Sequence, residues 1–129
     1  MKNQDKTQTS DGYWSRSLRQ RSENTGRMID TKVVGVSYDG RQRVVEKLRV
    51  GEEILLRREP SNPYDRNAIR VERLDGAQIG YLNRFLAANL APSFDSHNKP
   101  IPAGVTNLLG TSSAGHNIGV EIRFVVPEL

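Results

Sequence analysis

The sequence contains no cysteine among its 129 residues. This absence excludes a disulfide scaffold, a thiolate zinc site and a cysteine nucleophile, and it is compatible with a reducing compartment. No apolar run approaches the length of about 18 residues that a membrane-spanning helix needs, and the N-terminal residues lack the apolar block of a secretory signal. Together these absences predict a soluble, cytoplasmic protein that has no membrane partner.

Apolar and aromatic residues are also scarce, at 36% and 6% of the chain. Residues 1–30 contain almost no aliphatic side chains apart from Leu18, Met28 and Ile29. A segment of this composition cannot bury enough apolar surface to offset the entropy lost on ordering. The sequence therefore predicts a disordered basic tail over residues 1–30 and one folded domain over residues 31–129.

The basic residues exceed the acidic ones only modestly, 19 against 15, but fourteen of the 19 are arginine. The planar guanidinium group pairs bidentately with phosphate and stacks on bases, which slightly favours a nucleic acid partner. A GC-rich coding sequence is the alternative explanation. In the tail, Tyr13 and Trp14 precede a basic stretch that could follow a phosphate backbone or could simply be solvated.

After residue 30, β-branched residues alternate or cluster in short runs that are typical of strands. These runs cover residues 31–38, 52–59, 68–74, 77–82, 104–109 and 118–126. Asp75-Gly76 is a hairpin signal between two of them. Five or six short strands at close spacing predict a mainly β fold, a small closed or partly closed barrel.

Two helical segments interrupt the strand pattern. Residues 40–48 predict one or two helical turns that end by Gly51, and Asn83 is placed to cap a helix over residues 84–91. In that second helix we expect Phe85, Leu86 and Leu90 to share an apolar face. We expect it to stop near Pro92 and to be followed by a loop over residues 93–103.

The turn at residues 60–67, Pro-Ser-Asn-Pro-Tyr-Asp-Arg-Asn, carries the most suggestive side chains. An exposed Tyr64 would offer a stacking face worth about 1–3 kcal/mol per base. Asp65 would accept a hydrogen bond from a sugar hydroxyl but repel a phosphate, and would therefore discriminate a free 3′ end. The arginines near this turn would offset its charge. The alternative is structural, with Asp65 bonding turn amides and Tyr64 packing over the barrel end.

Catalytic signatures are few. The two histidines, His97 and His116, lie in separate predicted loops without metal-ligand spacing, and the 110–115 segment lacks the lysine of a phosphate-binding loop. The carboxylates of Glu59, Asp65 and Asp75 are scattered rather than paired, so a metal-dependent nuclease is only a remote option. The sequence predicts a protein that is not an enzyme and that uses no cofactor and no metal.

The blocks Leu-Arg-Arg-Glu-Pro-Ser-Asn-Pro-Tyr-Asp-Arg-Asn-Ala-Ile-Arg-Val and Ile-Gly-Tyr-Leu-Asn-Arg-Phe-Leu-Ala, with Gly-x-x-Tyr upstream, resemble the HIRAN domain family. The likeness spans about residues 33–90 and continues more loosely to the last strand. Members of this family occur in SWI2/SNF2-type translocases that remodel stalled replication forks, and as free-standing bacterial domains, which this chain resembles. The resemblance implies an OB-like β-barrel of five to six strands that grips the 3′ end of single-stranded DNA.

Position by position, the resemblance implies a set of nucleic-acid-binding residues. Tyr38, at the end of the first predicted strand, matches a base-contacting tyrosine. Tyr64 and Asp65 match a pair that stacks the terminal base and accepts the 3′ hydroxyl, and Arg84 falls at a basic phosphate contact. Ser37 stands where translocase members can have arginine, and the link near His116 replaces a segment that can carry a stacking phenylalanine.

The predicted function is therefore non-catalytic binding of single-stranded DNA or DNA 3′ ends through base stacking, a carboxylate and arginine–phosphate contacts. The alternative is a protein-interaction adaptor that recruits a DNA repair or replication factor. Such an adaptor would use exposed sheet edges or the Tyr13-Trp14 tail.

Overall fold

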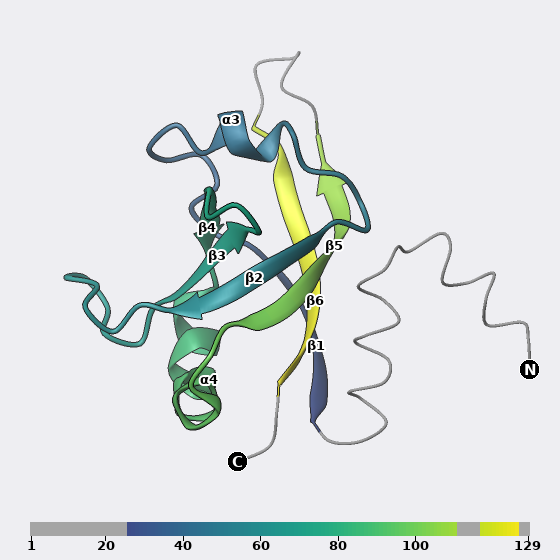
Figure 1. Ribbon diagram of the computed structural model, residues 1–129. Helices are drawn as coiled ribbons and strands as arrows, with labels where there is room; N and C mark the ends of the chain where they lie inside the picture. The colour runs from purple at the N-terminus through teal and green to yellow at the C-terminus, as the bar shows by residue number, and fades with distance from the viewer. Residues whose placement is uncertain (1–25, 111–116, 127–129) are drawn as a thin grey trace, which may run out of the picture.

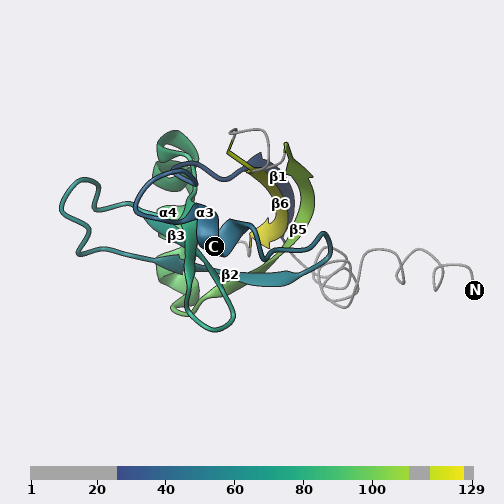
Figure 2. The same ribbon diagram turned by 90° about the horizontal axis from the view of Figure 1, so that it is seen from above.

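The computed structural model describes residues 26–110 and 117–126, whose six strands form one antiparallel sheet in the order β1-β6-β5-β2-β3-β4. The strands are β1 (Arg27–Lys32), β2 (Glu53–Arg58), β3 (Ile69–Arg73), β4 (Gln78–Tyr81), β5 (Ile101–Leu109) and β6 (Gly119–Val126). The sheet curls into a half-barrel, with β1, β6 and β5 facing β3 and β4 (Figures 1 and 2). The expected mainly β, barrel-like fold is confirmed.

The core lies on the concave face of the sheet, where alternate residues of each strand point inward. In β6, for example, Val120, Ile122 and Phe124 have no exposed surface, while Glu121 and Arg123 between them are half-buried. The core members on the other strands include Ile54, Leu56, Ile69, Val71, Ile79, Ile101, Ala103 and Val105. This alternation is the pattern from which the strands were predicted.

The first strand begins earlier than the sequence suggested. β1 starts at Arg27 and pairs with β6 from Arg27↔Val126 to Lys32↔Glu121, so residues 27–30 belong to the sheet and not to the tail. The chain then leaves β1 and crosses to the far edge of the sheet. There Val34 pairs with Tyr81 through two backbone hydrogen bonds of 2.9 and 3.0 Å. The predicted strand over residues 31–38 is therefore wrong beyond this bridge.

Gly80 makes this crossing possible. A Cβ at this position would lie 2.4 Å from the Val34 carbonyl oxygen and 2.7 Å from Val33 Cγ1, so no side chain fits between the two backbones. This close approach brings β4 and the residues after β1 together, and these two segments flank the cleft described below.

The helices cover two ends of the half-barrel (Figure 1). The short helix α3 (Gln42–Val45) buries Val45, and Leu48 is buried just after it. The longer helix α4 (Arg84–His97) begins as predicted, because Asn83 Oδ1 accepts hydrogen bonds from the amides of residues 85 and 86. Neither helix is long and apolar enough to cross a membrane.

Three predictions about α4 are wrong. The helix continues past Pro92, and residues 101–103 belong to β5, so no loop covers all of 93–103. Pro92 is exposed on the solvent side, where water can bind the Ala88 carbonyl that the proline cannot. Phe85 is 86% exposed, whereas Leu90 and Phe94 pack in the core. The buried face of α4 is therefore rotated away from Phe85.

Candidate nucleic-acid interface

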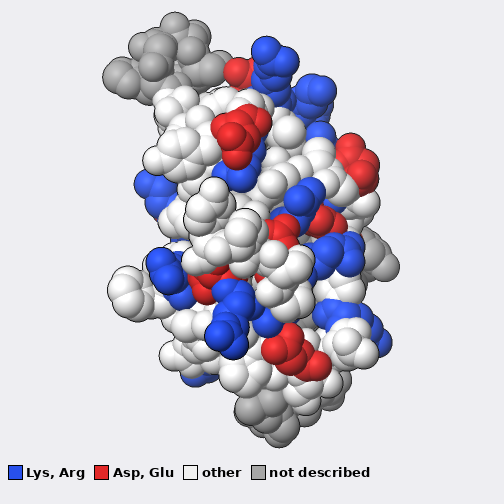
Figure 3. All heavy atoms as spheres, turned by 90° about the vertical axis from the view of Figure 1, so that its left-hand side faces the viewer, with Lys and Arg blue, Asp and Glu red and all other residues white. Residues whose placement is uncertain are grey.

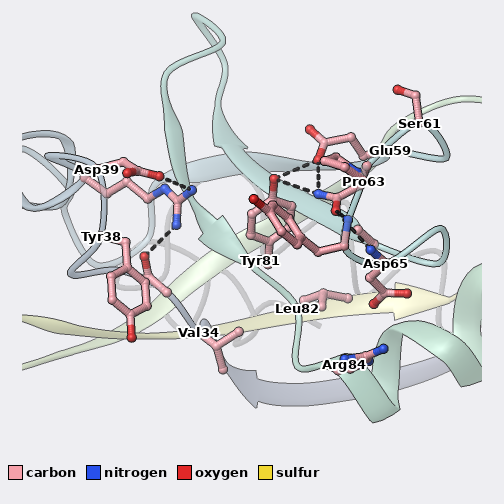
Figure 4. Close-up of a pocket in the computed structure, with 15 residues that line it drawn as sticks. Val34, Tyr38, Asp39, Glu59, Ser61, Pro63, Asp65, Tyr81, Leu82 and Arg84 are labelled. Atoms are coloured by element: carbon pink, nitrogen blue, oxygen red, sulfur yellow. Dashed lines mark hydrogen bonds and ion pairs between the residues drawn. The ribbon is translucent and has the colours of Figure 1, made fainter.

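A cleft of about 850 Å³ lies between the turn at residues 35–41 and the β2–β3 loop, residues 59–68. It brings together four predicted site residues: Tyr38, Tyr64, Asp65 and Arg84. Figure 4 shows Tyr38 on one side of the cleft and Asp65 and Arg84 on the other, with Tyr81 between them. Ser37 is exposed in the same turn but does not line the cleft, and His116 lies outside the described residues.

The β2–β3 loop projects from the body of the domain (Figure 2), yet its backbone is held by its own side chains. Asn62 Oδ1 accepts hydrogen bonds from the amides of Tyr64 (2.8 Å) and Asp65 (3.1 Å). Asp65 Oδ1 in turn accepts from the amide of Asn67 (2.9 Å). Side-chain acceptors of this kind replace the strand hydrogen bonds that a loop lacks. The loop therefore presents Tyr64 and Asp65 in a defined geometry.

Tyr64 and Asp65 both keep contact surface for a ligand. The Tyr64 side chain does not pack over the barrel end, because the residue is 88% exposed. Asp65 is half-buried, and only Oδ1 accepts a hydrogen bond from the described residues, which leaves Oδ2 available. The alternative, in which both side chains have only structural roles, therefore applies to Asp65 Oδ1, which bonds a turn amide, and not to the exposed Tyr64.

Tyr38 was expected at the end of a strand, but it lies in a tight turn. Positive φ angles at Gly35, Asp39 and Gly40 reverse the chain, and they suit these residue types. The turn is anchored by Arg41, whose Nη1 donates to the Gly35 carbonyl at 2.8 Å. Tyr38 itself is 67% exposed at the cleft.

Tyr81 forms part of the cleft between these two segments. Its hydroxyl donates a hydrogen bond to Glu59 Oε1 at 2.7 Å and accepts one from Asn62 Nδ2 at 3.2 Å. The Arg41 guanidinium lies over the Tyr81 ring, 5.4 Å from its centroid. A tyrosine suits this place because its ring packs while its hydroxyl bonds polar partners.

The hydrogen bonds shift the pKa of both partners. Desolvation, the largest single effect on Glu59, raises its pKa, but the hydrogen bonds from Asn62 and Tyr81 and the charges of Arg70 and Arg41 outweigh it, so the pKa is lowered. Desolvation and the hydrogen bond to Glu59 raise the pKa of Tyr81. Near neutral pH, Glu59 is thus an ionised acceptor and Tyr81 a neutral donor.

We expected the arginines near the β2–β3 loop to offset the charge of Asp65, but most of them are bound to other carboxylates. Arg57 and Arg70 both pair with Glu72 at 3.0 Å, which explains how that glutamate can be buried. Two further ion pairs are Arg58 with Asp95 and Arg73 with Glu52. Figure 3 accordingly shows Lys and Arg interspersed with Asp and Glu on this face.

Arg84 and Arg66 differ from these arginines. Both are exposed, and neither forms an ion pair with a described residue. Of these two, only Arg84 lines the cleft. The lining contains two guanidinium groups, Arg41 and Arg84. It also contains three carboxylates, Asp39, Glu59 and Asp65, so negative groups outnumber positive ones. The cleft suits an uncharged group better than a phosphate.

Sequence reasoning missed the residues that support the site. Arg41, Glu59 and Asn62 were not singled out as site residues, yet each bonds a segment that carries a predicted one. Asn62 offered a signal, because an asparagine side chain in a turn often accepts a hydrogen bond from the backbone amide two residues further along the chain. Arg41 and Glu59 offered none. Among the described residues, no group of three or more His, Asp or Glu side chains could hold a metal ion.

The curled six-stranded sheet and its tyrosine-lined cleft define a small β-barrel-like domain. The chain belongs to the HIRAN domain family, whose model matches residues 26–125. Two solved structures agree in fold. The HIRAN domain of human HLTF is 29% identical, with a TM-score of 0.56 over 78% of this chain and 77% of that one. A protein from Lactobacillus plantarum is 28% identical, with a TM-score of 0.57 over 78% of this chain and 99% of that one.

Curated relatives match over shorter stretches. Helicase-like transcription factor from Oryctolagus cuniculus is 53% identical over 45 residues, which are 35% of this chain and 4% of that protein. Fanconi-associated nuclease 1 homolog from Arabidopsis thaliana is 33% identical over 91 residues, which are 70% of this chain and 10% of that protein. The matched region is thus a tenth or less of these relatives.

Proposed function

We propose that this domain binds single-stranded DNA at its 3′ end, in the cleft between Tyr38 and Tyr64, without chemical conversion. The observation that carries the proposal is the pairing of an 88% exposed Tyr64 with an Asp65 that keeps one carboxylate oxygen available, on a loop held by Asn62. A nucleobase can stack on the ring, and the terminal 3′ hydroxyl can donate to Asp65 Oδ2.

The charge of the lining favours an end over an internal segment. A terminal nucleoside with a free 3′ hydroxyl brings only one phosphate, on its 5′ side. An internal nucleotide brings a second phosphate toward Asp65, where the two negative charges would repel. Arg84 lies at the cleft and can neutralise the one phosphate that must approach. The cleft is therefore better matched to a strand end.

The relatives support a nucleic acid partner in general terms. Their names describe a helicase-like transcription factor and a nuclease homolog, both of which act on nucleic acids, and the matched region is a small part of each. We also propose a DNA repair or replication protein as a partner, because a binding domain without its own catalytic activity would act by bringing another protein's activity to DNA.

Fluorescence anisotropy with the unmodified protein tests the proposal. We expect the tightest binding to single strands that end in a 3′ hydroxyl, and weaker binding to the same strands with a 3′ phosphate or to circular strands without an end. The expected difference is roughly tenfold or more, the value of a charge-assisted hydrogen bond. Equal affinity for all three DNAs would reject end recognition, and no binding at low salt would reject the function.

Replacing Arg84 with alanine is expected to weaken every DNA to a similar extent. A lost phosphate contact removes one released counterion, so the slope of log K against log salt should fall in magnitude by about one unit. Arg66→Ala is the matched control, because its guanidinium is also exposed, forms no ion pair with a described residue and does not line the cleft. If both variants lose the same affinity and slope, Arg84 has no special role and binding follows net charge.

A protein partner at the β1 edge is the second candidate function. β1 is an outer strand of the sheet, and no described segment pairs with its free edge, whereas Val34 covers part of the other edge at β4. Strand addition is a common mode of peptide binding. The Val33 amide donates to Val120 of β6, so by alternation along the strand the Lys32 amide faces the free edge. A Lys32→Pro variant would remove this donor and block strand addition, while leaving the cleft intact. Loss of a partner but not of DNA binding would assign the two functions to separate surfaces.

A further inference from the structure

Tyr81 links the two sides of the cleft. Its hydroxyl contacts Glu59 and Asn62 at the base of the β2–β3 loop, and its ring lies under Arg41, which anchors the Tyr38 turn. Tyr38 and Tyr64 belong to segments that are otherwise far apart along the chain. Figure 4 shows Tyr81 between Tyr38 and Asp65, with a dashed hydrogen bond from its hydroxyl to Glu59.

The hydrogen bonds of Tyr81 determine which way the Asn62 amide faces. Asn62 Nδ2 donates to Glu59 Oε1 at 2.7 Å and to the Tyr81 hydroxyl at 3.2 Å, so the amide nitrogen is fixed toward these two oxygens. Oδ1 must then face the opposite way, where it accepts from the amides of Tyr64 and Asp65. A reversed amide would point donors at donors, which is unfavourable.

Arg41 supplies the connection on the other side. Its Nη1 donates to the Gly35 carbonyl, and its Nη2 lies 3.4 Å from Asp39 Oδ2, so one guanidinium binds both ends of the turn that holds Tyr38. The Arg41 side chain is only 12% exposed. A buried guanidinium above an aromatic ring has little freedom, and the Tyr38 turn is therefore placed relative to Tyr81.

We propose that Tyr81 is a positioning residue that sets the spacing and orientation of Tyr38 against Tyr64 and Asp65, so that one terminal nucleoside contacts both sides of the cleft. This inference rests on the proposed function. Tyr81 itself need not touch DNA. Its hydroxyl orients Asn62, Asn62 orients the loop, and its ring receives Arg41.

The Tyr81→Phe variant removes the hydroxyl and leaves the ring for Arg41. Two effects are expected. In the free protein, the amide protons of Tyr64 and Asp65 should exchange roughly fivefold to tenfold faster, because Asn62 loses one of its two fixing contacts. In binding, the ratio of affinities for 3′-hydroxyl and 3′-phosphate strands should fall by a similar factor. Glu59→Gln, which weakens the same contacts from the carboxylate side, should shift both readouts in the same direction.

Thr106→Val is the control, because it removes a side-chain hydroxyl from β5, outside the cleft. It should leave the exchange of the Tyr64 and Asp65 amides and the affinity ratio unchanged. If the wild type binds 3′ ends and Tyr81→Phe matches Thr106→Val in both measurements, the positioning role is overturned and the proposed function stands. If the wild type ignores all oligonucleotides, the proposed function is overturned together with the role given to Tyr81.

Discussion

Replacing Tyr64 with alanine is expected to weaken binding of a 3′-hydroxyl single strand about fivefold to 150-fold, while the stability of the domain stays nearly unchanged. Base stacking on an aromatic side chain contributes about 1–3 kcal/mol by alanine substitution, which corresponds to this range. Stability should hold because Tyr64 is 88% exposed and is not part of the core. Anisotropy titration and urea unfolding measure the two quantities.

Two variants separate stacking from general loss of apolar surface. Tyr64→Phe keeps the stacking face and should bind within about twofold of the wild type. Leu74→Ala removes another exposed apolar side chain, 60% exposed in the β3–β4 hairpin and away from the cleft, and should have no effect. An alanine variant of Tyr64 that binds DNA as well as the wild type would mean that no base stacks there.

The strands could be predicted because their patterning is local. In β3, Ile69 and Val71 alternate with polar residues, and both are fully buried. Asn83 and the Asp75-Gly76 hairpin were predictable for the same reason, because caps and tight turns depend on a few adjacent residues. The Asp75 carboxylate accepts from the Ala77 amide, as such a turn requires.

The errors lie where a distant segment decides the structure. The valines after Thr31 suggested a continuous strand, but Val34 pairs with Tyr81, 47 positions along the chain, and the backbone then turns at Gly35. Pro92 predicts a helix end, but its exposed position lets water bind the Ala88 carbonyl that the proline cannot. Packing of Phe94 against the core keeps the chain helical past it.

The proximity of Tyr64 and Asp65 was predictable from the sequence, whereas the contacts that hold them in place were not. Tyr64 and Asp65 adjoin in the sequence, so their proximity needed no knowledge of the fold. The ion pair between Arg57 on β2 and Glu72 on β3 depends on how these two strands align. Likewise, the hydrogen bond from Tyr81 to Glu59 joins residues 22 positions apart. Such contacts follow from the sheet register, which single-sequence patterns do not define.

Replacing Asp65 with asparagine is expected to abolish the preference for a 3′ hydroxyl over a 3′ phosphate, a change of roughly tenfold to hundredfold in the affinity ratio. Asparagine keeps an oxygen that can accept from the Asn67 amide, so the loop should persist. The group facing the ligand changes from an anionic acceptor to an amide donor, which attracts a phosphate instead of repelling it. Parallel anisotropy titrations with the two strand ends measure the ratio.

Asp39→Asn distinguishes a specific hydrogen bond from a general negative potential. Asp39 also lines the cleft, and its side chain is 81% exposed. If the potential of the lining decides which end binds, removing either charge should reduce the preference to a similar extent. If Asp65 acts by accepting the hydroxyl proton, Asp39→Asn should retain most of it, because Asp39 lies on the Tyr38 side of the cleft. Asp65→Ala should lose the preference as well, and should also loosen the loop at the Asn67 amide. A preference that survives both Asp65 substitutions would show that end recognition resides elsewhere.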